Sequence, residues 1–112
     1  MIDEARINEL IGLCIQTGQP ETFGYMLQQF IDSLQAAQND LRINSPLKNQ
    51  EIFHALKGRC GTFGAIAIAQ AIIEAEHAPP EHHHNHLNQI LLVISQSIDV
   101  LQQLLALHSQ KS

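Results

Sequence analysis

His54 lies in a segment whose residue spacing predicts a helix with one apolar face and one polar face. At about 100° per residue, the apolar side chains of this segment share about one third of the helix circumference: Ile52, Phe53, Leu56, Cys60 and Phe63. His54 points almost directly away from them, and Lys57 follows it one turn later. Neutral imidazole is well populated near physiological pH and is a good nucleophile, so an exposed His54 is a candidate for covalent chemistry. Without further context, a histidine beside a lysine on a helix is more often a solvated face.

Two glycines lie on the same side of the predicted helix as His54. Gly58 and Gly61 follow it at i+4 and i+7, although a glycine inside a helix costs about 1 kcal/mol relative to alanine. Both leave the helix surface bare, which allows a partner's backbone or a bulky group to come close to the imidazole. Gly61 has a second interpretation, because residues 61–64 also look like the end of a helix. Leu47, one turn further back on this side, is expected to supply apolar contact to a partner.

The residues from His54 onward resemble the signature of histidine-containing phosphotransfer (HPt) domains of two-component phosphorelays. That signature is approximately His-x-Leu-Lys-Gly, a few small residues, then an aliphatic residue, Gly and Ala. In this chain it is matched by His54-Ala55-Leu56-Lys57-Gly58 and by Gly64-Ala65. The match continues more weakly at positions where the family favours Leu, Cys or an aliphatic residue, Leu and Glu: Ile68, Ile72, Ala75 and Glu76. The chain departs from the pattern at Arg59 and Cys60, where small residues are usual, at Phe63, which replaces the common Leu, and at the small Ala75. Arg59 adds a charge near the site.

This resemblance implies that His54 accepts a phosphoryl group from the aspartyl phosphate of a receiver domain and passes it reversibly to a second receiver. It implies response-regulator receiver domains and a hybrid sensor histidine kinase as partners, with Mg²⁺ bound by the receiver and no cofactor bound by this chain. Lys57 is then expected to steady the phosphate, while Gly58, Gly61 and Leu47 meet the partner.

The chemistry of the residues agrees with a carrier that has no kinase activity of its own. Phosphoryl transfer needs mainly positioning and charge stabilisation, and Lys57 places a compact cation one turn from His54. The sequence has no phosphate-binding loop of the G-x-x-x-x-G-K-[ST] type and no kinase-type glycine loop. Glu51 is the one carboxylate that the sequence places beside His54, so no carboxylate cluster for Mg²⁺ is expected there.

The composition predicts a single soluble domain, residues 1–112. A formal charge of −5 with six Lys and Arg argues against a nucleic-acid-binding protein. No uninterrupted apolar run approaches the length of about 20 residues that spans a bilayer, and the first residues lack a signal-peptide layout. Cys14 and Cys60 both lie on apolar helical faces, which suggests reduced core thiols and a cytoplasmic location.

Apolar periodicity predicts an all-α fold, an antiparallel four-helix bundle with an additional short N-terminal helix. The expected helices cover residues 3–16, 20–44, 46–61, 65–77 and 82–109, with Ser45 as an N-cap. Gly18 is expected to end the first helix, and Pro20 to lie in the first turn of the second. Two helices carry long seams with 4-3-4-3-4 spacing: Phe23, Leu27, Phe30, Leu34, Ala37 and Leu41, and Leu87, Leu91, Ile94, Ile98, Leu101 and Leu105. We expect a monomer.

A histidine-rich turn offers an alternative function. Five imidazoles surround Pro79-Pro80, at His77, His82, His83, His84 and His86. His82 and His86, at i and i+4, share a helix face and are candidate ligands for Zn²⁺, Ni²⁺ or Cu²⁺, although no H-E-x-x-H is present and no cysteine is near. Two further alternatives are a helical adaptor that binds response regulators without chemistry and a purely structural bundle.

Overall fold

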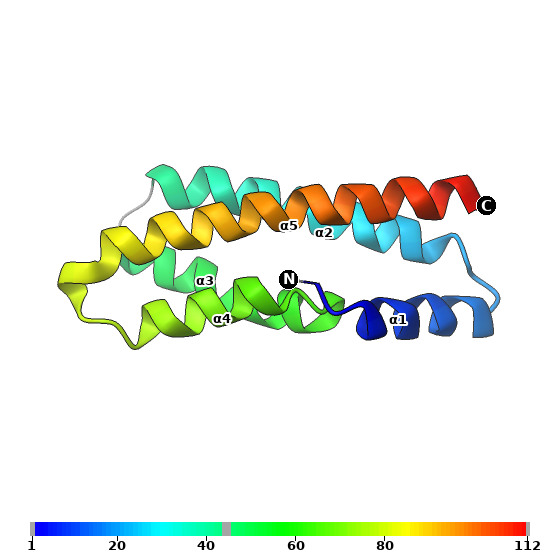
Figure 1. Cartoon of the computed structure of the whole chain (residues 1–112), viewed down its shortest axis with the longest axis horizontal. Helices are drawn as coiled ribbons and strands as arrows, with labels where there is room; N and C mark the ends of the chain where they lie inside the picture. The colour runs from blue at the N-terminus through cyan, green and yellow to red at the C-terminus, as the bar shows by residue number, and fades with distance from the viewer. Residues whose placement is uncertain (1, 44–45, 112) are drawn as a thin grey trace.

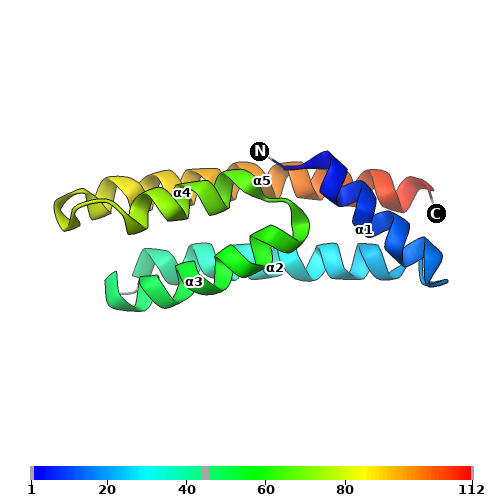
Figure 2. The same cartoon turned by 90° about the horizontal axis from the view of Figure 1, so that it is seen from below.

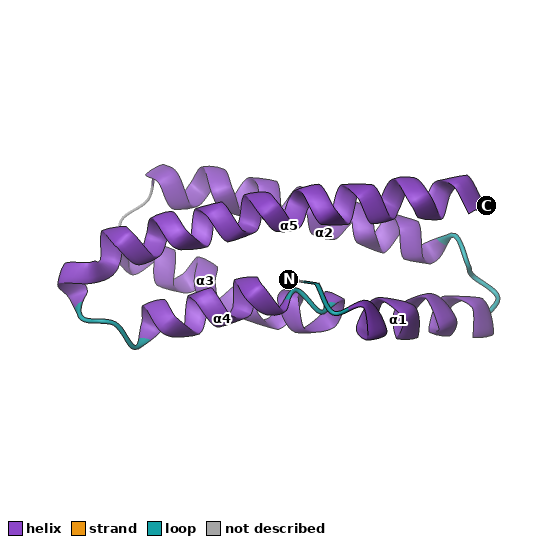
Figure 3. Ribbon diagram, in the orientation of Figure 1, coloured by secondary structure: helices purple, strands orange, loops and turns teal. Residues whose placement is uncertain are grey.

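The structure is a computed structural model that describes residues 2–43 and 46–111, with side chains described except at 46, 47 and 109–111. This part of the chain is helical and contains no strand (Figure 3). Its elements are α1 (Glu4–Gln16), α2 (Thr22–Ile43), α3 (Pro46–Phe63), α4 (Ile66–Glu76), the short 3₁₀ helix η1 (Pro80–His82) and α5 (His83–Lys111). The all-α class is therefore confirmed.

The long helices α2 and α5 lie side by side along the molecule, which measures 49 × 21 × 19 Å (Figures 1 and 2). The shorter α3 and α4 cover one half of this pair: α3 contacts α2 and α4, and α4 also contacts α5. From α2 to α5, successive helices run in opposite directions (Figure 1). α1 covers the other half and contacts α2 and the end of α3 (Figure 2). This arrangement places α3, the helix of His54, between α2 and α4.

The apolar seam predicted for α2 forms the centre of the core. All six of its residues are buried. The seam predicted for α5 is only partly correct, because its ends, at Leu87, Leu91 and Leu105, are half-buried. α5 also buries Ile90, Val93 and Ser97, which the seam omitted. Since α5 packs against both α2 and α4, its buried strip is wider than one seam.

The start of α1 is bonded to the corner between α3 and α4. Asp3 caps α1, its Oδ1 accepting a hydrogen bond from the N–H of Ala5 at 3.1 Å. The N–H of Asp3 donates to the carbonyl of Gly64 at 2.7 Å, and Arg6 Nε donates to the carbonyl of Thr62 at 2.9 Å. The first helix is therefore an integral part of the fold rather than a loosely attached segment.

α3 ends at Phe63, not at residue 61 as the sequence predicted. Gly64 is the residue that stops it, with a left-handed backbone (φ 67°), and the N–H of Ala65 donates to the carbonyl of Cys60 at 2.9 Å. This hydrogen bond is typical of a helix end closed by a glycine. Gly61 therefore lies inside the helix.

The other boundaries agree with the prediction to within a few residues. Gly18 has φ 74° and follows the last residues of α1, as expected. α2 begins at Thr22, so Pro20 lies in the turn before it rather than in its first helical turn. α5 is preceded by η1, a separate short element. The N-cap predicted at Ser45 lies outside the described residues.

One segment, Pro80–His108, is long and apolar enough to cross a membrane by length and composition. Polar residues such as Ser95 and Gln96 divide this segment, so it contains no uninterrupted apolar run of that length. In the structure it supplies fully buried core residues, Ile90, Ile94 and Leu101, that pack among the other helices. A core helix of a soluble protein has this composition as well, and the compact packing favours a soluble protein.

Candidate functional site

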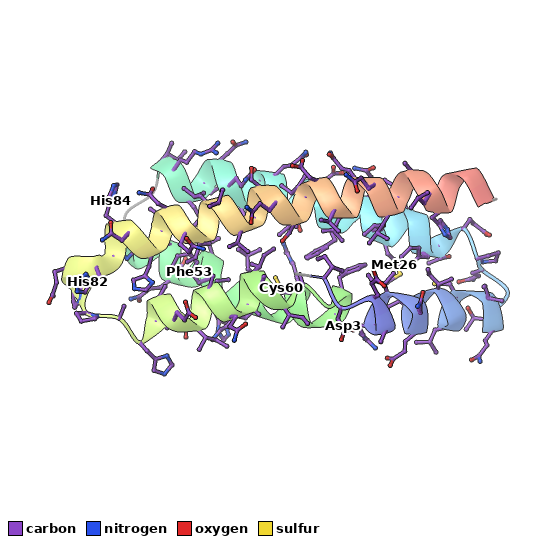
Figure 4. All side chains as sticks on the ribbon, in the orientation of Figure 1. Asp3, Met26, Phe53, Cys60, His82 and His84 are labelled. Carbon is purple, nitrogen blue, oxygen red and sulfur yellow. The ribbon has the colours of Figure 1, made fainter. Side chains whose placement is uncertain are left out.

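α3 presents His54 to solvent and buries the opposite face, as its residue spacing predicted. Phe53, Leu56 and Cys60 are at most 3% exposed, whereas His54 is exposed. Figure 4 shows Phe53 and Cys60 directed into the interior of the molecule. At the end of α3, the ring of Phe63 stacks on that of Phe30 in α2, with centroids 4.6 Å apart. These contacts fix the rotation of α3 about its axis and hence the direction of the imidazole.

A cavity of about 530 Å³ lies beside His54. Its walls come from α3, from the end of α4 and from the connection to α5: Gln50, Phe53, His54, Ala75, Glu76, Ala78, Pro79, Pro80 and His83. In the sequence, His83 and the two prolines belong to the histidine-rich turn, which is distant from His54 along the chain. The antiparallel return of α4 along α3 brings that turn to His54, and periodicity within a single helix does not reveal such a contact.

Lys57 forms an ion pair with Glu76 of α4. Its Nζ lies 2.9 Å from one carboxylate oxygen and 3.0 Å from the other. Glu76 also lines the cavity beside His54. The sequence had placed only Glu51 near the imidazole, so Glu76 is a second carboxylate there. Lys57 therefore lies one turn from His54 with its ammonium already bound to a carboxylate.

The glycine surface predicted around His54 is present. A Cβ atom built on Gly58 or on Gly61 meets no other heavy atom within 4 Å, and both residues are exposed. No internal contact thus requires a glycine at either position. Because Gly61 lies inside α3, its interpretation as a helix terminator is wrong. Leu47 belongs to α3, but its side chain lies outside the described residues, so its predicted contact stays a prediction.

Two departures from the HPt pattern point away from His54. Arg59 lines a separate groove of about 350 Å³ between α2 and α3, together with Met26, Gln29 and Phe30. The charge that the sequence placed near the site is therefore directed toward α2. Cys60 lies in the core, where burial raises the pKa of its thiol to about 12. A thiol that stays neutral is a poor nucleophile and does not compete with the imidazole.

The histidines around the α4–α5 connection are distributed over the end of α4, η1 and the start of α5. Within residues 2–43 and 46–111, no group of three His, Cys, Asp or Glu side chains is arranged to hold a metal ion. Nδ1 of His77 donates to the carbonyl of Ile73 at 2.8 Å and so caps its own helix. His82 lies in η1 and is exposed, while His86 is half-buried in α5. Figure 4 shows His82 and His84 at the end of the molecule, with His84 directed outward.

The arrangement supports nucleophilic chemistry on a large, accessible electrophile. An exposed imidazole, a bare helix surface and an adjacent cavity leave room for a protein-sized partner. Comparisons with protein-family models, with curated proteins and with solved structures each found no match. The resemblance to HPt domains therefore rests on the residues of this chain alone.

Proposed function

We propose that this protein is a phosphoryl carrier in which His54 accepts the group from a receiver-domain aspartyl phosphate and passes it to another receiver. The observation that carries the proposal is the exposed His54 on a helix face that is otherwise bare at Gly58 and Gly61. In this proposal α2, α3, α4 and α5 form the four-helix bundle that the HPt resemblance implies, with α1 as the additional helix.

The transfer step needs only the imidazole of this chain and an activated phosphate. The lone pair of a ring nitrogen of His54 attacks phosphorus, and a nitrogen–phosphorus bond forms. The bond between phosphorus and the acyl oxygen breaks, and the partner's aspartate leaves as a carboxylate. The proton on the other ring nitrogen stays in place, and the reverse sequence delivers the group to the next aspartate.

The partner supplies the remaining parts of the reaction. Phosphoryl transfer requires charge neutralisation on the transferring oxygens, which a receiver-bound Mg²⁺ provides in this scheme. Response-regulator receivers and a hybrid sensor histidine kinase in the cytoplasm are the proposed partners. The accessible face around His54 suits them because a receiver's aspartate must approach the imidazole in line.

The test is transfer of labelled phosphate. The purified protein is incubated with a panel of phosphorylated receiver domains in the presence of Mg²⁺, beside a His54→Gln variant. We expect acid-labile, alkali-stable label on the wild type and none on the variant, with receiver binding by the variant unchanged. If the variant retains both receiver binding and signalling output, His54 is not the acceptor and the protein is a binding module instead.

A further inference from the structure

Glu76 occupies an unusual position for a carboxylate in this fold. It is the last residue of α4, where the carbonyl end of the helix already carries partial negative charge, and no basic residue of α4 lies in that last turn. A carboxylate at a helix C-terminus opposes the helix dipole, so this placement does not stabilise α4 by itself. Glu76 also forms part of the wall of the cavity beside His54.

The carboxylate of Glu76 binds the cation nearest to His54 on α3. Its two oxygens lie 2.9 and 3.0 Å from Lys57 Nζ. The side chains are 31% exposed for Lys57 and 35% exposed for Glu76, so water and a ligand both reach the pair. Before any phosphoryl group is present, the ammonium of Lys57 is therefore already paired with the carboxylate of Glu76.

A phosphoryl group on His54 would compete with Glu76 for Lys57. A phosphoryl group brings about two negative charges and three acceptor oxygens. Since His54 and Glu76 line one cavity, the two anions would repel each other across it, and added salt would screen this repulsion. Lys57 can neutralise the phosphoryl group fully only by leaving Glu76, and while the Lys57–Glu76 ion pair is kept the charge of the phosphoryl group is incompletely neutralised.

We propose that Glu76 sets the transfer potential of phosphorylated His54, holding Lys57 and opposing the charge of the phosphoryl group so that the group remains labile. This inference rests on the proposed function. In a carrier, a phosphohistidine stabilised too strongly would trap the group, whereas one opposed by Glu76 passes it to the next aspartate. Glu76 is a positioning residue in this scheme, because it acts through Lys57 and through the field in the cavity.

The test measures the equilibrium between one phosphorylated receiver and phosphorylated His54. Glu76→Gln should shift this equilibrium about fivefold toward His54, equivalent to about 1 kcal/mol, and should slow hydrolysis of the phosphohistidine. Glu76→Asp should restore most of the wild-type value, and the shift should shrink as salt is added. Glu74→Gln is the matched control, since Glu74 lies on the same helix, is exposed and does not line the cavity.

A second variant keeps the test decisive if Glu76→Gln does not fold. Lys57→Gln leaves Glu76 without its partner and should shift the equilibrium toward the phosphorylated receiver. Circular dichroism checks the fold of each variant, and phosphoramidate serves as a donor that needs no receiver. Equal equilibria for wild type, Glu76→Gln and Glu74→Gln, or no shift in Lys57→Gln, would overturn the role of Glu76 while leaving the carrier function intact. A wild type that accepts no label on His54 from any donor would overturn both proposals.

Discussion

At the scale of single residues, the face of α3 on which a side chain lies decides its reactivity. His54 and Cys60 are both nucleophile types on one helix, but His54 is exposed and Cys60 is 1% exposed. Burial raises the pKa of Cys60 to about 12 because the thiolate cannot be hydrated in the core. Of these two side chains, only the imidazole is accessible to a partner.

The buried thiol makes the stability of the protein depend on alkaline pH. In the unfolded chain Cys60 titrates near its usual value of 9.0, while in the folded protein it keeps its proton up to about 12. Between these values the unfolded state binds fewer protons, so the free energy of unfolding should fall by about 1.4 kcal/mol per pH unit at most. Below pH 9 this contribution is constant.

Urea unfolding at pH 8 and pH 10 measures this effect. From pH 8 to pH 10 the free energy of unfolding of the wild type should fall by about 1 kcal/mol more than that of Cys60→Ala, because the alanine variant lacks the titrating thiol. Cys14→Ala, at a half-buried cysteine, serves as the control and should behave as the wild type does. The same pH dependence in wild type and Cys60→Ala would show that the thiol is not protected by burial.

At the scale of the element, the glycines of α3 and of the corner after it have different roles. Gly58 and Gly61 lie inside the helix over open space. Gly64 has φ 67°, and a Cβ built there would lie 2.9 Å from the Cβ of Asp3. The fold therefore does not require a glycine at position 58 or 61, whereas it requires one at position 64.

Replacing Gly58 or Gly61 by alanine should stabilise the protein and impair transfer. Each change should raise the free energy of unfolding by up to about 1 kcal/mol through helix propensity. Each should also slow transfer from a receiver by at least about fivefold, since an added methyl in a packed contact costs about 1–3 kcal/mol. Gly12→Ala in α1, also over open space, is the control that should stabilise without slowing transfer. Unchanged transfer rates in both α3 variants would mean that this surface does not meet the partner.

Replacing Gly64 by alanine should instead destabilise the protein by about 2 kcal/mol or more. A residue with a Cβ atom is strained in the left-handed backbone conformation, and this Cβ would also be too close to Asp3. Gly18→Ala isolates the backbone part of this cost, since Gly18 has φ 74° but nothing within 4 Å of its built Cβ. Thermal or urea unfolding compares the two variants. Equal losses would indicate that the contact between Asp3 and Gly64 contributes nothing.

Residue spacing predicts the buried face of a helix more reliably than it predicts where the helix ends. The α2 seam follows from periodicity alone, and all of its residues are buried. The end of α3 does not follow from periodicity, because either Gly61 or Gly64 can end a helix, and the contact of Gly64 with Asp3 comes from a distant part of the chain. Helix periodicity reports which face is buried but not which neighbour covers it.

At the scale of the whole molecule, the site is assembled from parts that are distant in the sequence. The exposure of His54 and the open glycine surface were predicted from α3 alone. The Lys57–Glu76 ion pair and the approach of His83 depend on the antiparallel packing of α3, α4 and the start of α5, which sets the register between helices. That register comes from side-chain packing in the core, so residue spacing within one helix could not provide it.

The most direct test of the account is to locate the phosphoryl group within the chain. The wild type, His54→Gln and His83→Gln are phosphorylated by the same receiver, and peptide mass spectrometry at alkaline pH identifies the modified residue. His83→Gln is the control, because it changes a second imidazole that lines the same cavity. The account predicts one phosphoryl group on His54 in the wild type and in His83→Gln, and none in His54→Gln. A phosphoryl group that remains in His54→Gln, or that maps to another histidine in the wild type, would contradict it.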